Sequence, residues 1–172
     1  MADVAAALPA AAGETPRGPD DLQGISLEAF RLTNAYRCSL GLRPCRWHGG
    51  LARIALERAS RMASGAASFS HAGLAAHSSQ LPIVHCGVAE NLCHCWSEDV
   101  ARYAVEGWIG SPDHERNLRG RFGLCGVGTA CSPQGTFYLV QLFAAAPTVL
   151  AAVLAAIAAS AVLAALAALA MQ

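Results

Sequence analysis

Two histidines and two glutamates are the residues of this sequence whose types and spacing indicate chemistry. They are His71, Glu90, Glu106 and His114, in a stretch otherwise rich in Ala, Leu and Val. An imidazole or a carboxylate is costly to bury alone, so apolar surroundings indicate partner side chains, a metal ion or a solvated cleft. Two neutral imidazoles with one or two carboxylates suit zinc, with water completing the coordination. The alternative is that the glutamates bind backbone amides and the histidines bridge to them without a metal.

Three further residues are candidates for the same cleft. Ser70, Asn91 and Trp108 each lie within two positions of one of the four residues. Trp108 has the strongest claim of the three tryptophans to line a cleft. Ser70 lies beside a histidine, but the sequence has no Gly-x-Ser-x-Gly elbow of the kind that presents a nucleophilic serine.

Hydrophobic periodicity predicts the helices that must position these side chains. Ser26 is a suitable N-cap for a helix that runs to about Leu40. A second helix is predicted from about Gly50 to Ser64. Five of its residues recur at helical spacing: Leu51, Ile54, Ala55, Arg58 and Met62.

The second half of the sequence predicts shorter helices and then strands. Residues 97–99 (Ser-Glu-Asp) open a helix that ends near Gly110, and Ser111-Pro112 begins another, with Ser as the cap and Pro at the first position. Residues 126–129 and 136–143 surround a Ser-Pro-Gln-Gly turn and are predicted to form a hairpin. Short extended pieces are also expected near Arg46 and Val88. Helices followed by a hairpin indicate an α+β layered domain.

The four candidate residues therefore come from different local structures. His71 lies in a loop-like segment and Glu90 in an extended piece, whereas Glu106 and His114 lie on either side of the break at Ser111-Pro112. Convergence of side chains from several elements is the normal construction of a functional site.

Composition restricts the class of protein. The 172 residues, 54% of them apolar, are enough to fill the core of one domain. Twelve basic residues balance twelve acidic ones, so no charged field would recruit nucleic acid or an anionic membrane surface.

Seven cysteines are many for a reduced cytosolic domain, and they favour export with disulfides. Cys38 and Cys45 flank a turn that a disulfide between them would staple. A second cluster is formed by His85 and Cys86 with Cys93 and Cys95. In an exported domain we expect Cys86 to form a disulfide with Cys93 or Cys95. If reduced, the same cluster would bind zinc. The odd total leaves at least one thiol free or intermolecular.

The two ends of the chain differ from the middle. Residues 1–24 are predicted to be a disordered leader or a weak signal, residues 25–146 the folded domain, and residues 147–172 a hydrophobic C-terminal tail. Residues 149–171 are apolar on every helical face and long enough to cross a bilayer. The tail is either a transmembrane anchor or a glycosylphosphatidylinositol (GPI) signal that processing removes. Both alternatives predict membrane association.

The chain from about Leu27 to Phe143 resembles the CAP superfamily, which comprises the cysteine-rich secretory, antigen 5 and pathogenesis-related 1 proteins and whose domain is also called SCP. The spacing resembles that of compact bacterial members. The residues that carry the resemblance are Leu32-Thr33-Asn34-Ala35-Tyr36-Arg37, Leu42-Arg43-Pro44 with Trp47, Phe69-Ser70-His71, Ala89-Glu90-Asn91, Glu106-Gly107-Trp108, Ser111-Pro112-Asp113-His114 with Asn117-Leu118, Cys125-Gly126-Val127-Gly128 and Tyr138 to Phe143.

The resemblance implies a three-layer α-β-α sandwich, secreted or displayed at the cell surface. It also implies a cleft lined by two histidines and two glutamates, here His71, Glu90, Glu106 and His114. In some members the histidines hold zinc, which would make His71 and His114 the metal ligands. Other members are credited with sterol or fatty-acid binding. Ala89 departs from the family, which usually has Gly before the glutamate.

The function expected from these features is that of an extracellular or surface-displayed binding protein. Its cleft would take a divalent metal, with a groove for a lipid, sterol or protein ligand. The alternative is a metal-dependent hydrolase, in which a glutamate activates metal-bound water. The sequence contains no HExxH helix of the common metalloproteases. A third hypothesis is an interaction module in which the His/Glu set only stiffens the fold.

Overall fold

The structure of the protein is a computed structural model, and it describes residues 18–74 and 87–145. The described elements, in chain order, are α1 (Pro19–Ser39), β1 (Arg46–Trp47), α2 (Gly49–Ala63), β2 (Val88–Cys95), α4 (Val100–Gly110), α5 (Pro112–Leu118), β3 (Leu124–Cys131) and β4 (Phe137–Ala144).

The strands form a four-stranded sheet in the order β1-β3-β4-β2. The predicted hairpin is confirmed as β3 and β4, which pair antiparallel, and β1 is parallel to β3. The last strand in this order, β2, is antiparallel to β4, with Glu90 opposite Leu142 and Asn91 opposite Gln141. Because side chains alternate along a strand, Glu90 and Asn91 lie on opposite faces of the sheet.

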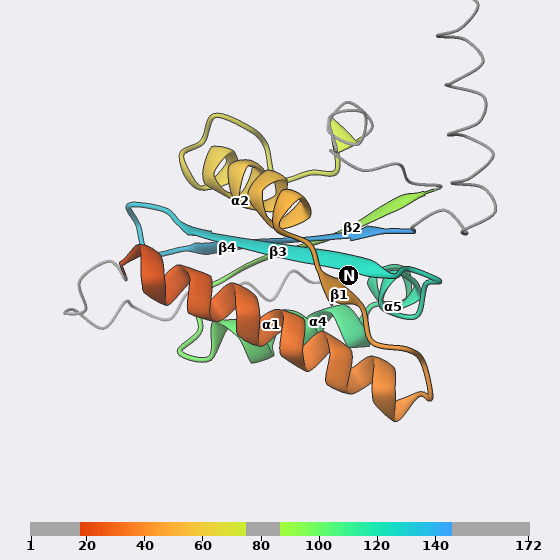
Figure 1. Ribbon diagram of the computed structural model, residues 1–172. Coiled ribbons are helices and arrows are strands. Elements are labelled where there is room, and N and C mark those ends of the chain that lie inside the picture. The colour runs from red at the N-terminus through yellow and green to blue at the C-terminus, as the bar shows by residue number, and fades with distance from the viewer. Residues whose placement is uncertain (1–17, 75–86, 146–172) are drawn as a thin grey trace, which may run out of the picture.

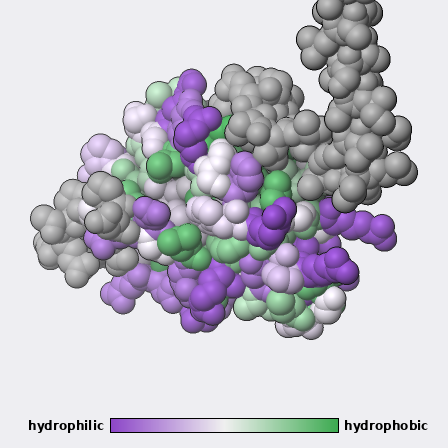
Figure 2. Space-filling model, in the orientation of Figure 1, coloured by the Kyte–Doolittle hydropathy of each residue, from purple (hydrophilic) through white to green (hydrophobic). Residues whose placement is uncertain are grey.

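Helices cover both faces of the sheet, so the expected α-β-α sandwich and α+β class are confirmed. In Figure 1, α2 lies on one side of the strands and α1 and α4 on the other, with α5 near one end. One apolar cluster packs α2 against the sheet, and another packs α1 and α4 against its opposite face. On the face seen in Figure 2, hydrophilic side chains are interspersed with small apolar areas.

Two glycines of β3 allow α2 to approach the sheet closely. A Cβ atom at Gly126 would collide with the backbone of Leu51 and Ala52, and one at Gly128 with the backbone of Ala55 and Leu56. The Gly-Val-Gly sequence therefore fixes the distance between helix and sheet. This packing holds the buried face of α2 directly over the strands.

The first helix begins earlier than the sequence predicted. It starts at Pro19 rather than after Ser26, because proline suits the first helical position and the Asp21 carboxylate accepts a 3.1 Å bond from the Gly18 backbone N–H. Ser26 lies inside the helix, where its hydroxyl forms a 2.8 Å hydrogen bond with the Thr129 hydroxyl. Part of the segment assigned to the leader is thus helical.

The expected hydrophobic tail and most of the leader lie outside the described residues. Within residues 18–74 and 87–145, no helix has the length and apolar character needed to cross a membrane.

Candidate His/Glu cleft

A buried ion pair holds the centre of the site. Glu90 of β2 points toward α2, and none of its side chain is exposed. Arg58 of α2 meets it with Nε 2.6 Å from Oε2, while Nη2 donates a 3.1 Å hydrogen bond to Oε1. A carboxylate in this position requires a charged partner, because an unpaired buried charge is strongly unfavourable.

The same arginine also anchors the loop that carries the first histidine. Arg58 Nη1 donates to the Ala72 carbonyl at 3.2 Å, and Nη2 donates to the Ser70 carbonyl at 3.3 Å. One buried guanidinium therefore joins helix, strand and loop. The sequence placed Arg58 at helical spacing with four apolar residues but indicated no role for it. An arginine at helical spacing with apolar residues was the signal in the sequence that could have indicated a buried partner.

His71 connects the buried pair to solvent. Its Nδ1 lies 2.9 Å from Glu90 Oε1, while 54% of its side chain is exposed. A carboxylate only accepts hydrogen bonds, so Nδ1 carries the proton of the neutral ring. The lone pair is then on Nε2. This is the arrangement in which a carboxylate orients an imidazole as a ligand.

His114 of α5 completes a pair of imidazoles. Its ring centroid is 6.3 Å from that of His71, with the two planes inclined by 53°. Partial burial lowers the pKa of His114, and the nearby His71 lowers it further, whereas Asp113 acts in the opposite direction. The neutral form, which can donate a lone pair, is therefore favoured near neutral pH.

Glu106 is not brought to this pair. It lies on the solvent side of α4, where 67% of its side chain is exposed and its carboxylate is 3.8 Å from Arg102. The buried residues of α4 explain this position, because they form a stripe on the opposite side: Val100, Ala101, Ala104, Val105 and Trp108. The expected second glutamate of the cleft is thus a surface residue.

Trp108 and Asn91 lie in the interior rather than along an open cleft. Trp108 is 1% exposed, and its indole N–H donates to the Leu92 carbonyl at 3.0 Å. Asn91 is fully buried, and its Nδ2 donates to Gln141 Oε1 at 3.1 Å and to the His114 carbonyl at 3.3 Å. The last bond fixes the backbone that carries the second imidazole.

Two further polar contacts support the site. Asn117 donates to Asn91 Oδ1 at 2.8 Å and to the Glu90 carbonyl at 3.1 Å, which ties α5 to β2. The Ser70 hydroxyl bonds with the Ser68 hydroxyl at 3.2 Å and accepts from the Ala72 N–H at 3.4 Å. Ser70 therefore shapes the loop.

The donor set at this site fits a cation held by two imidazoles. Across residues 18–74 and 87–145, no group of three or more His, Cys, Asp or Glu side chains is placed to share a metal ion. Both Glu90 oxygens face Arg58 or His71, so this glutamate would orient a ligand rather than bind the ion itself. His71 and His114 would hold the ion, with water in its remaining positions.

Comparisons with known proteins agree with this architecture. The model of the cysteine-rich secretory protein family, CAP, matches residues 30–143, which is more than half of the chain. The chain belongs to the CAP family. A search of curated proteins found no match.

Solved structures share the CAP fold at low sequence identity. An extracellular SCP-domain protein from Bacillus anthracis is 23% identical with a TM-score of 0.61, over 77% of this chain and 45% of that one. An outer surface protein from Borrelia burgdorferi is 15% identical with a TM-score of 0.64, over 77% and 98%. A cysteine-rich secretory protein from Staphylococcus aureus is 19% identical with a TM-score of 0.60, over 74% and 41%. This chain thus spans less than half of the Bacillus and Staphylococcus proteins.

An aromatic cluster begins two residues before His71 in the sequence. The Phe69 ring centroid is 4.5 Å from that of His94 and 6.3 Å from that of Tyr138. Trp96 lies 6.3 Å from His94 and is 73% exposed. We call these four residues the aromatic cluster. Exposed tryptophan and phenylalanine are typical of binding surfaces.

No disulfide joins any two of the cysteines that the structure describes, contrary to expectation. These six are Cys38, Cys45, Cys93, Cys95, Cys125 and Cys131. The staple predicted between the first two is absent because Cys38 is exposed, whereas Cys45 is buried and donates to the Phe122 carbonyl at 3.4 Å. Burial also raises the pKa of Cys45 and Cys125. Cys86 and His85 lie outside the described residues.

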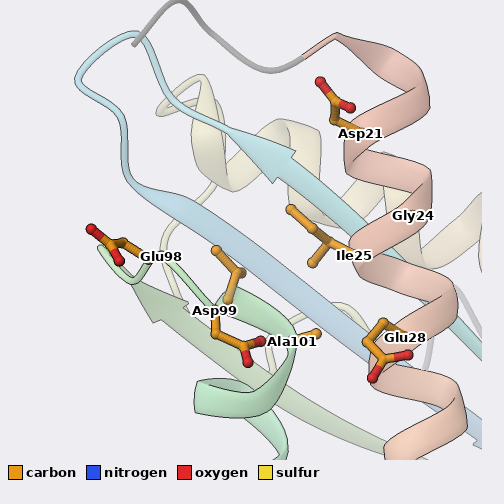
Figure 3. Close-up of a pocket in the computed structure, with 8 residues that line it drawn as sticks. Asp21, Gly24, Ile25, Glu28, Glu98, Asp99 and Ala101 are labelled. Carbon is orange, nitrogen blue, oxygen red and sulfur yellow. The ribbon is translucent and has the colours of Figure 1, made fainter. Parts of the chain in front are cut away.

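A separate open pocket of about 380 Å³ lies between α1 and the start of α4 (Figure 3). Four carboxylates surround it: Asp21, Glu28, Glu98 and Asp99. Two of them already have partners, since Glu28 pairs with Arg31 and Asp99 with Arg102. Its lining includes none of the residues of the histidine cleft.

Proposed function

We propose that the protein is an extracellular or cell-surface CAP-domain binding protein whose cleft takes a divalent cation, zinc being the first to test. His71 and His114 would be its ligands. The observation that carries the proposal is the Arg58–Glu90–His71 chain, which begins in the core and ends at a half-exposed imidazole facing His114. A histidine that only packed against its neighbours would not need a buried ion pair to orient its ring.

The extracellular part of the proposal is supported by the family and by its named relatives. The Bacillus protein is described as extracellular and the Borrelia protein as an outer surface protein. We further propose that the tail at residues 147–172 provides membrane association, either as a spanning anchor or as a GPI signal. Phospholipase treatment distinguishes these two, because only a lipid-linked protein would be released from membranes.

The aromatic cluster supports an apolar ligand, for which a fatty acid is the first probe. Trp96 is far more exposed than Trp47 or the buried Trp108, so its fluorescence would report binding there. Palmitate should shift the emission to shorter wavelength in the unmodified protein and not in Trp96→Ala. If palmitate shifts the emission of neither the unmodified protein nor Trp96→Ala, a protein ligand, or no ligand at this cluster, is favoured instead.

The alternative, a metal-dependent hydrolase, has less support. Glu90 would be the catalytic base, but both of its oxygens face Arg58 or His71 and its side chain is enclosed. Glu106 is exposed beside Arg102. Glu90 is therefore not free to take a proton from water in the cleft, and Glu106 is not brought to the histidine pair.

Zinc titration calorimetry on the full chain tests the proposal. We expect one zinc ion per chain for the unmodified protein. His71→Ala and His114→Ala should each weaken binding about tenfold or more, since each removes one of two protein ligands. His94→Ala is the matched control, because it removes an exposed imidazole outside the cleft. Unchanged binding in both cleft variants would reject the proposal.

A further inference from the structure

Two cysteine side chains of β2 lie together on the face opposite the histidine cleft. Cys93 and Cys95 are two positions apart in the strand, opposite Leu139 and Phe137 of β4, so their side chains point to the same face of the sheet, where the two thiols influence each other electrostatically. Cys93 is partly exposed and Cys95 is buried. One residue of the pair is therefore partly open to solvent, while the other is enclosed.

His94 does not share this site. It lies between the two cysteines in sequence, so its side chain points to the other face of the sheet, where it contacts Phe69 and Tyr138. The Cys-His-Cys sequence thus contributes two sulfurs and no nitrogen. No third metal-ligating side chain joins them within the part of the chain that the structure describes.

A disulfide between these two cysteines conflicts with the strand. The Cβ atoms of residues i and i+2 on one face of an extended strand lie roughly 6.7 Å apart, whereas disulfide-linked Cβ atoms are about 3.8 Å apart. Closing that bond would distort the ladder between β2 and β4. A single metal ion bridges a wider gap, because two sulfurs each about 2.3 Å from a metal ion lie up to ~4.6 Å apart, whereas the sulfurs of a disulfide are about 2.0 Å apart.

We propose that Cys93 and Cys95 form a two-thiolate site for a soft monovalent ion of the Cu(I) type. Two thiolates suit such an ion, because soft sulfur ligands select Cu(I). Binding forms two metal–sulfur bonds and releases one proton from each thiol to solvent, with no change of oxidation state.

The test uses the full chain, reduced and kept without oxygen, with Cu(I) supplied in competition with a chromophoric Cu(I) chelator. We expect one tightly held Cu(I) per chain, with an X-ray absorption spectrum of two sulfur ligands and no nitrogen. Cys93→Ser and Cys95→Ala should each weaken binding about tenfold or more. Circular dichroism identifies any variant that fails to fold, and the partly exposed Cys93 is the safer of the two.

Two control variants make the result specific. Cys38→Ser removes an exposed thiol at the end of α1, and His94→Ala removes the imidazole between the two cysteines. Both should bind Cu(I) as the unmodified protein does. Loss of binding in His94→Ala, undiminished binding in Cys93→Ser, or a disulfide from Cys86 to either cysteine would overturn the proposal.

Discussion

Adjacent residues of β2 build two polar networks that differ in how they end. On the α2 face, Glu90 joins Arg58 and His71, and this charged network reaches solvent through a half-exposed ring. On the opposite face, Asn91 joins Gln141, which in turn donates to the Thr33 hydroxyl at 2.8 Å. This second network is neutral and fully enclosed, since all three residues are 0% exposed.

The open network on the α2 face is a candidate binding site, whereas the enclosed network on the opposite face supports the fold. A closed network with satisfied partners offers nothing to a ligand, and it specifies how the helices meet the sheet. An open network that ends in a free imidazole nitrogen offers a lone pair. The two are mechanically connected, because Asn91 also binds the carbonyl of His114.

The largest effect should come from removing the buried arginine. Arg58→Met leaves the Glu90 carboxylate enclosed without its cation, which should lower the free energy of unfolding by about 3–5 kcal/mol. Urea denaturation measures this change. The double variant Arg58→Met/Glu90→Gln should recover part of the loss. A single variant as stable as the unmodified protein would contradict the role of the ion pair.

Removing Asn91 from the enclosed network should cost less stability than removing Arg58. Asn91→Ala leaves Gln141 and Asn117 without a hydrogen-bond partner, at a cost of about 1–3 kcal/mol in unfolding free energy. Because Asn91 holds the backbone of His114 but is not itself a ligand, calorimetry should give a smaller loss of zinc affinity than His114→Ala does. If Asn91→Ala lost as much zinc affinity as His114→Ala, the enclosed network could not be distinguished from the binding site.

The proximity of the two imidazoles should be measurable without a metal. The pKa of His114 is lowered from 6.5, first by burial and then by His71, so His71→Ala should raise it toward that value without reaching it. The lowered pKa means that the unfolded chain takes up the proton first, so this residue reduces stability as the pH falls below about 6.5. Proton NMR titration of the imidazole tests both. An unchanged pKa in His71→Ala would show that the rings are apart.

The smallest effect is expected at Glu106. Because its side chain is exposed beside Arg102, Glu106→Gln should change the unfolding free energy by about 0.5 kcal/mol or less. Zinc affinity should be equally unaffected in calorimetry. A marked loss of zinc affinity would show that Glu106 takes part in the cleft.

The sequence predicted the layers and the histidine pair but misassigned one glutamate. The stripe of small and apolar residues on α4, together with an Arg102–Glu106 pair spaced i,i+4, already indicated that Glu106 faces solvent. The family resemblance outweighed that signal. Arg58 shows a different limit, because its place on the apolar face of the helix followed from its spacing, but its partner 32 residues away was not predicted. Local periodicity gives the face of a helix, whereas pairing across the sheet depends on the register.

The cysteines show the same limit. Composition favoured disulfides, but a pairing depends on distances between elements that spacing does not provide. Cys38 and Cys45 lie close in sequence, yet one is on the surface and the other in the core.

The most direct test of the account is nitrogen NMR of the imidazole rings during zinc titration of the full chain. We predict that ring resonances of His71 and His114 shift together and saturate at one equivalent, with His71 protonated at Nδ1. The other four histidines should keep their resonances. Shifts confined to other histidines, or to only one of these two, would contradict a shared cation site.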